Sequence, residues 1–211
     1  MVHWIVVVSL GWLVSFLGQL PLGTMSMTST QIAVEEGFRN AWKYSIGVAL
    51  IEILYLRTVL SGVDWIMQHH LFFEILGWLT VAFFGTLGVI SFISAVKQDG
   101  KKKPPLLNNR INRFWLGITM SALNPAQLPF WFVWSSYLLN IHALHSSALE
   151  YNLFTIGSGT GTVSGLVVYM YGGNWLITKM KTSSKTLNKV MGVIFVIAAL
   201  AQLYRMIFEK V

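Results

Sequence analysis

The chain has no cysteine among its 211 residues. This absence excludes disulfide bonds, thiolate metal sites and cysteine-based redox chemistry, and with them the membrane carriers that exchange thiols and disulfides. Charged residues are also scarce, at 11% of the chain, whereas soluble domains carry roughly a quarter. Because 55% of the residues are apolar, this composition is typical of a membrane protein.

Apolar runs long enough for membrane-spanning helices follow one another along the whole chain. Six such runs are predicted, over about 4–34, 40–62, 71–96, 114–139, 151–175 and 188–207. Their connections are too short for a second domain, so residues 1–211 are predicted to form one all-α polytopic membrane domain that is not an enzyme. No Lys or Arg precedes the first run, so we expect it to be a mature helix and not a signal peptide.

Basic residues lie in alternate connections between these runs. The first, third and fifth connections carry two, six and four Lys or Arg, the C-terminus carries two, and the N-terminus and the other connections carry none. By the positive-inside rule, both termini are expected to face outward and the odd connections to be cytoplasmic. A second reading gives Lys101–Lys103 a role in binding anionic lipid or in regulation.

A charged, proline-containing segment divides the runs into two sets of three. It covers about 98–113, between a first unit of about 1–97 and a second of about 114–211. Because three helices per unit turn the second unit upside down, related units would form an inverted repeat. We therefore predict two inverted three-helix repeats, each opened by a broken helix.

Helix-breaking residues interrupt the first and fourth runs, at Pro21–Thr24 and at Asn124–Pro125. The first run would measure roughly 46 Å as one helix, against a hydrocarbon core of about 30 Å. Asn124 can cap a restarted helix whose first residue is Pro125, and Thr24 can cap its counterpart. Two helix N-termini directed at the membrane centre favour an anionic group such as an amino-acid carboxylate. The alternative at each position is a proline kink without a ligand.

Polar residues follow both breaks. Thr24, Thr28 and Gln31 share one helix face, although a hydroxyl in a membrane helix also bonds back to its own helix. The predicted substrate-binding residues are Pro21, Gly23, Thr24, Thr28, Gln31, Asn124, Pro125 and Gln127.

Glu52 is the acidic residue nearest the centre of a predicted span. A buried ionised carboxylate is costly, which makes Glu52 the candidate for proton coupling. Arg57 lies five positions on and is poorly placed for an intrahelical pair, so it either extends outward or meets Glu52 through local distortion. A purely structural ion pair is the alternative role for Glu52.

The five histidines, His3, His69, His70, His142 and His145, map to the predicted outer side. Glu150 is nearby, but the spacings match no metal-binding motif, so no metal site and no cofactor are predicted. Gly157, Gly161 and Gly165 recur every four residues and predict a close helix-packing seam, with sliding along it as a further reading.

These residues resemble the LysE/RhtB family of amino-acid exporters along nearly the whole chain. The likeness rests on LGQLPLGTMSMTSTQIAVEEGFRNAWKYSIGVALIEILY, on ITMSALNPAQLPFWFVW and on the Gly-rich fifth run. Gly23 takes the glycine position of a family Pro-Gly-Pro motif, Glu52 the position of an aspartate, and Ala126 that of the lysine in Asn-Pro-Lys. The PLGT variant is similar to LysE-type proteins of Bacteroidetes.

The resemblance implies export of an amino acid or related small metabolite driven by the proton-motive force. It makes Pro21, Gly23, Glu52, Asn124 and Pro125 the expected site residues. The expected partners are a small-molecule substrate and the lipid bilayer, with no nucleic acid, and homo-oligomerisation is left open. The rival hypotheses are a metal or ion exporter on the same fold, and a membrane assembly or sensor protein that transports nothing.

Overall fold

The computed structural model describes residues 2–20, 23–96, 111–180 and 184–208. Within these ranges the chain forms eight α-helices, and the all-α prediction is confirmed. The helices are α1 (Val2–Gln19), α2 (Thr24–Glu36), α3 (Phe38–Gln68), α4 (His70–Val96), α5 (Arg113–Ala122), α6 (Gln127–Asn140), α7 (Ala148–Met180) and α8 (Ser184–Phe208).

Both predicted breaks are present. The first apolar run becomes α1 and α2, whose axes differ by 80°, and the fourth becomes α5 and α6. The other four runs form the single helices α3, α4, α7 and α8. Hydrophobic periodicity and helix-breaking residues therefore locate the elements, although α3 and α7 extend several residues beyond the apolar runs that predicted them.

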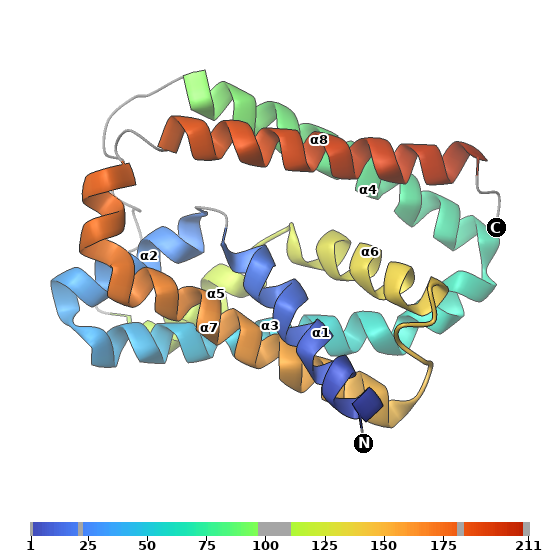
Figure 1. The fold of residues 1–211 in the computed structure, drawn as a ribbon, viewed down its shortest axis with the longest axis horizontal. Helices are drawn as coiled ribbons and strands as arrows, with labels where there is room; N and C mark the ends of the chain where they lie inside the picture. Colours follow the sequence, from blue (N-terminus) through green and yellow to red (C-terminus); the bar gives the residue numbers. More distant parts are fainter. Residues whose placement is uncertain (1, 21–22, 97–110, 181–183, 209–211) are drawn as a thin grey trace.

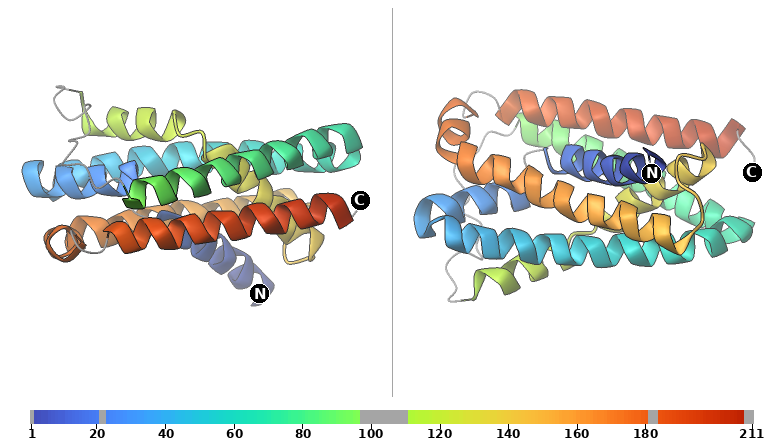
Figure 2. Two further views of the ribbon diagram at one scale, coloured as in Figure 1. Left: turned by 90° about the horizontal axis from the view of Figure 1, so that it is seen from above. Right: turned by 60° about the horizontal axis from the view of Figure 1, so that its bottom comes forward.

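The long helices α3 and α7 pack against each other at the centre of the bundle. Each of them also packs against a half-helix from the other three-helix unit of the chain. The half-helix α1 lies along α7, and α5 lies along α3. Helices α4 and α8 pack together as a pair on one side of these elements (Figures 1 and 2). The beginning of α1 and the end of α8 lie toward the same end of the molecule (Figure 1).

Glycines allow α1 and α7 to approach backbone to backbone. A Cβ on Gly157 would stand 2.1 Å from the carbonyl oxygen of Val8, and one on Gly11 would stand 2.2 Å from that of Phe154. The predicted glycine seam on α7 is thus confirmed, and α1 is its partner. Any side chain beyond hydrogen at these positions would separate the helices.

Glycines also allow α3 and α5 to approach backbone to backbone where they cross. A Cβ on Gly117 would stand 2.2 Å from the carbonyl oxygen of Tyr44, and one on Gly47 would stand 2.3 Å from that of Phe114. Each crossing therefore places one glycine of each helix against the backbone of the other.

Among the described residues, two helices are long and apolar enough to cross a membrane, over Phe38–Val63 and Ala148–Gly172. The bent pair His3–Gln19 and Thr24–Glu36 passes the same criteria as one broken span. Shorter apolar stretches lie at Gly77–Ile93 in α4 and at Phe195–Phe208 in α8. These lengths suit a membrane protein whose helices run through the bilayer.

Substitution of a seam glycine tests this packing. We expect Gly157→Ala to lower the free energy of unfolding by about 1–3 kcal/mol, because the methyl group overlaps the backbone of α1. Gly85→Ala on α4 is the matched control, since nothing lies within 4 Å of an added Cβ there. Thermal unfolding in detergent, followed by tryptophan fluorescence, measures both variants. Equal melting temperatures for the two variants would contradict the close approach.

Candidate substrate and coupling site

The first break is held together by side chains that bond the last carbonyl groups before it. Ser26 Oγ donates to the carbonyl oxygen of Gln19 at 3.2 Å, and the Tyr169 hydroxyl donates to that of Leu20. Thr30 Oγ1 in turn donates to the Tyr169 carbonyl at 3.0 Å. Because a helix end leaves its last carbonyls without intrahelical partners, these bonds replace the missing ones.

Helix α2 begins without a side-chain cap. Gly23 is its N-cap, with φ −106° and ψ 177°, and within the part of the chain that the structure describes there is no side-chain cap hydrogen bond at this helix start. The expectation that Thr24 caps this helix is therefore wrong: Thr24 is the first helical residue, because Gly23 already supplies the extended backbone that a cap position needs. The open N–H groups and the helix dipole make this end suitable for an anion.

At the second break, the helix restarts two residues later than predicted. Helix α6 begins at Gln127 with Ala126 as its N-cap, so Pro125 lies in the preceding turn and not at the first helical position. Asn124 Oδ1 accepts the backbone N–H of Ala126 at 3.1 Å, and the Asn124 carbonyl accepts that of Gln127 at 3.3 Å. Asn124 thus bonds the chain as a cap would, but it closes a turn before the helix.

A tyrosine from α3 bonds the last residue before the second break. The Tyr55 hydroxyl donates to the carbonyl oxygen of Ala122, the final residue of α5, at 2.7 Å. Tyr169 of α7 bonds Leu20 in the same way at the first break. Each broken span is therefore held by a tyrosine on the long central helix of the other unit.

Glu52 is buried where α1, α3 and α7 meet, with 4% of its surface exposed. Its carboxylate accepts from Ser15 Oγ at 3.2 Å and from Gln19 Nε2 at 2.9 Å, and the Thr162 hydroxyl lies against the same group. Ser15 and Thr162 hydroxyls are 2.7 Å apart. All these partners are neutral, so they solvate the carboxylate without cancelling its charge.

Gln19 joins this carboxylate to the first break. Its side chain donates to Glu52 while its main-chain carbonyl accepts from Ser26 in the first turn of α2. Gln19 therefore bonds both the Glu52 carboxylate and the first turn of α2.

Arg57 does not pair with Glu52. Its guanidinium donates to Ser61 Oγ at 3.0 Å and lies over the ring of Tyr151, 5.7 Å from the ring centre. Of the two readings left open by the sequence, the one in which Arg57 extends away from Glu52 fits this geometry. Within the described residues, no Lys or Arg side chain bonds to Glu52.

A second polar group lies on another side of α3, at the second break. Gln127 Nε2 donates to Ser121 Oγ at 2.8 Å, and Ser121 Oγ donates to the carbonyl oxygen of Val48 at 3.2 Å. Val48 lies one helical turn before Glu52, so the two polar groups lie at neighbouring levels of α3.

The predicted residues of α2 are placed differently from one another. Thr24 is exposed at the start of the helix. Thr28 is buried, and its hydroxyl donates to the carbonyl of Thr24 at 2.7 Å in its own helix. Gln31 donates to the carboxylate of Glu35 at 2.9 Å, nearer the other end of α2. Pro21 lies outside the described residues.

Buried polar atoms without a protein partner follow one face of α6. Gln127 Oε1, Trp131 Nε1 and Ser135 Oγ stand at i, i+4 and i+8 and have no hydrogen-bond partner among the described residues. Ser158 Oγ on α7 is also buried and has no hydrogen-bond partner among the described residues. Such groups are costly in an apolar interior unless a polar molecule bonds them.

Sequence reasoning missed the direct partners of Glu52, namely Ser15, Gln19 and Thr162, and the two tyrosines that bond the breaks. One signal was present: Gly11-x-x-x-Ser15 in α1 matches Gly117-x-x-x-Ser121 in α5. In both helices the glycine makes the close crossing and the serine, one turn on, bonds toward α3.

A helical bundle with two broken helices, a polar interior and a buried carboxylate at the junction defines a membrane protein of the transporter class. The chain belongs to the LysE type translocator family, whose model matches residues 16–206. The match confirms the resemblance found in the sequence, and membership indicates an exporter of amino acids or related compounds. No curated protein and no solved structure matches the chain.

Removal of the tyrosine hydroxyls tests how the breaks are held. We expect Tyr169→Phe and Tyr55→Phe each to lower the free energy of unfolding by about 1 kcal/mol, because each removes the donor of a part-buried hydrogen bond to a carbonyl at a break. Tyr137→Phe is the control, since Tyr137 is 48% exposed on α6. Thermal unfolding in detergent gives the comparison. If all three variants melt with the wild type, the hydroxyls do not hold the breaks.

Proposed function

We propose that the chain is a secondary-active exporter of an amino acid or a related small metabolite, coupled to protons by alternating access. The observation that carries this proposal is Glu52, a buried carboxylate with only neutral partners, connected through Gln19 to a helix break. Family membership supplies the general function, and the geometry around Glu52 supports the coupling.

The substrate carboxylate is proposed to bind at the helix N-termini beside the breaks. The uncapped start of α2 offers free backbone N–H groups next to Gly23 and Thr24, with Thr28 one turn on. Asn124, Pro125 and Gln127 form the corresponding start of α6, and Pro21 and Gln31 complete the predicted set. Unpartnered polar atoms of Gln127 and Trp131 support a polar route along α6.

The coupling step is competition at Glu52. An ionised carboxylate among neutral groups is stabilised by a proton or by a cation, and the ammonium group of an amino acid is such a cation. In the proposed cycle the substrate ammonium displaces the proton on one side of the membrane, and a proton displaces the substrate on the other. The substrate then leaves Glu52 only when a proton replaces it, and the proton leaves only when substrate replaces it. This exchange links export of the substrate to entry of a proton.

The proposed architecture has six spans in two inverted repeats within one domain over residues 1–211. Reciprocal packing supports the repeat: α1 crosses α7 as α5 crosses α3, each through a pair of glycines. Tyr169 and Tyr55 bond the two breaks in the same reciprocal manner. In an inverted repeat, these equivalent contacts open alternately at opposite membrane faces.

The proposed location is the bacterial inner membrane, with both termini outside. The location of basic residues in the first, third and fifth connections supports this orientation. The beginning of α1 and the end of α8 lie toward the same end of the molecule, as an even number of spans requires (Figure 1).

Proteoliposomes that contain the purified protein test the coupling. We expect Glu52→Gln to reduce uptake of radiolabelled amino acids driven by a pH gradient to the level of empty liposomes, because an amide exchanges no proton. Glu52→Asp keeps a carboxylate and is expected to restore part of the flux. Glu74→Gln is the matched control, since Glu74 is exposed on α4 and is not one of the proposed site residues.

Wild-type counterflow separates the parts of this proposal. If the wild type shows amino-acid counterflow and the pH gradient still drives uptake in Glu52→Gln, the protein is a transporter in which Glu52 does not couple protons. Absence of any amino-acid counterflow, with flux of divalent metal ions in its place, would favour an ion exporter. Absence of all flux in correctly folded protein would favour an assembly or sensor role.

A further inference from the structure

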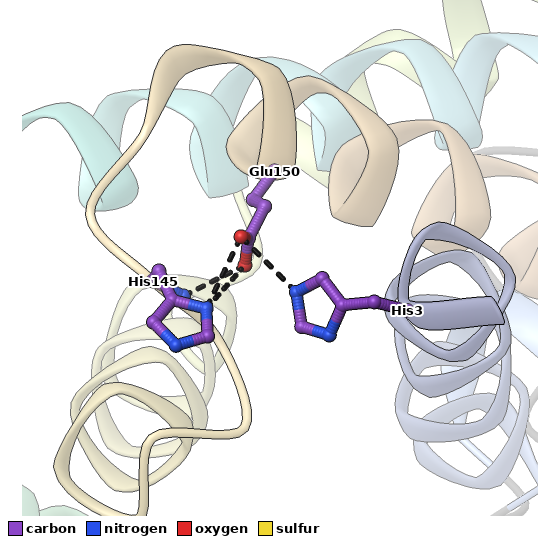
Figure 3. Close-up of side chains that lie close together, drawn as sticks. All are labelled: His3, His145 and Glu150. Carbon is purple, nitrogen blue, oxygen red and sulfur yellow. Dashed lines mark hydrogen bonds and ion pairs between the residues drawn. The ribbon is translucent and has the colours of Figure 1, made fainter. Parts of the chain in front are cut away.

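Three side chains from distant parts of the chain meet at the end of the bundle where α1 and α7 begin. His3 lies on α1, His145 in the connection before α7, and Glu150 in the first turn of α7 (Figure 3). His3 Nε2 is 3.1 Å from Glu150 Oε1, and His145 Nδ1 is 3.1 and 3.2 Å from the two carboxylate oxygens. One ligand atom from each of the three side chains can be chosen so that all three atoms lie within 4.8 Å of one another.

Glu150 is held in place before any ligand binds. Its side chain is 7% exposed, and Oε2 accepts the backbone N–H of His145 at 2.8 Å. Ser147 immediately precedes α7, and its hydroxyl accepts the Glu150 N–H at 3.2 Å, which fixes the first turn. The carboxylate orientation is therefore set by the helix start and by the connection before it.

The connection that carries His145 is also anchored. Leu144 is 2% exposed and packs in the same apolar cluster as Trp131 and Phe154. The N–H groups of Ala143 and Leu144 both donate to the carbonyl of Leu138, at 3.0 and 3.1 Å. His145 thus follows a buried residue, while its ring and that of His3 remain open to solvent, 58% and 44% exposed.

We infer that His3, His145 and Glu150 form a binding site for a divalent transition metal of the zinc class. Two imidazoles and one carboxylate are a recurrent ligand set for Zn²⁺, with the fourth position left to water. Metal–ligand bonds of about 2.1 Å in a tetrahedron place ligand atoms about 3.4 Å apart, close to the spacing of Glu150 with each histidine. The exposed histidine rings can rotate to complete the geometry.

The site departs from the sequence expectation of no metal because its ligands come together only in the fold. His3 and His145 are separated by nearly the whole first repeat and part of the second, so no ligand spacing exists in the sequence. Ring centres of the two histidines lie 5.3 Å apart in the structure. The cluster forms because α1 packs along α7.

A bound metal would join the start of α1 to the start of α7. The opposite end of the molecule has a different closure, in which Arg113 of α5 bonds Glu36 of α2 through Nε at 2.7 Å and a second nitrogen at 2.5 Å. Each closure joins the first turn of a half-helix to a glutamate, which is Glu150 in the first turn of α7 or Glu36 at the end of α2. Only the closure at His3 contains histidines, so a metal of the zinc class would stabilise that end selectively. This site stands independently of the proposed transport function.

Metal titration of the full-length protein tests the site. The protein is purified by an affinity tag without histidine and titrated with Zn²⁺ by calorimetry and with Co²⁺ by visible absorption. We expect one equivalent of Zn²⁺ to bind, the melting temperature to rise, and Co²⁺ to give the strong absorption of a four-coordinate ion. His3→Gln, His145→Gln and Glu150→Gln are each expected to weaken binding at least about tenfold, the size of effect that loss of metal-site partners commonly has.

Two controls make the result decisive. His69→Gln alters an exposed histidine at the end of α3 that bonds the Trp65 carbonyl, and it is expected to bind Zn²⁺ as the wild type does. Metal-free melting temperatures and gel-filtration profiles identify any variant that fails to fold. His3→Gln is the most informative of the three, because His3 lies on a different helix from Glu150 and its side chain is 44% exposed. No metal-dependent shift in the wild type, or equal Zn²⁺ affinity in His3→Gln and His69→Gln, would overturn the site.

Discussion

The structure depends on satisfying the backbone groups that two broken helices leave without partners. The bilayer interior offers no water to bond them, so the protein must supply donors at each break. Tyr169 and Tyr55 do so from the long central helix of the opposite unit. They reach the breaks only because α1 lies on α7 and α5 lies on α3 at glycine-to-backbone distance. Close helix crossings are therefore a condition for the breaks, and the breaks are a condition for the site.

The sequence predicted the elements well and their contacts poorly. Runs of apolar residues and the breaks at Gly23 and Asn124 are local signals, so they located all eight helices that the structure describes. Helix starts were less accurate: Asn124 closes a turn and α6 starts at Gln127, because an asparagine side chain bonds the backbone equally well in either arrangement. The face shared by Thr24, Thr28 and Gln31 exists, but Thr28 bonds its own helix.

The partners of Glu52 could not be predicted because they depend on which faces of α1 and α7 turn inward. Ser15 is a single hydroxyl in an apolar run, and Thr162 is one of several hydroxyls between the glycines of α7. The helix crossing selects these two by placing Gly11 and Gly157 at the contact, so that Ser15, four residues after Gly11, and Thr162, five residues after Gly157, lie at Glu52. A residue's distance from a glycine seam is thus a better guide to the site than its polarity.

Gln19 gives the proposed coupling a physical form. An ionised Glu52 accepts a hydrogen bond from the Gln19 amide nitrogen, whereas a protonated Glu52 donates one and favours the amide oxygen. The two protonation states therefore favour different orientations of the Gln19 side chain, and the Gln19 main-chain carbonyl also bonds Ser26 at the start of α2. Because that start is where a substrate carboxylate is proposed to bind, proton exchange and substrate exchange act on the same turn of helix. An arginine beside Glu52 would keep the carboxylate ionised and remove this difference, and Arg57 lies over Tyr151 instead.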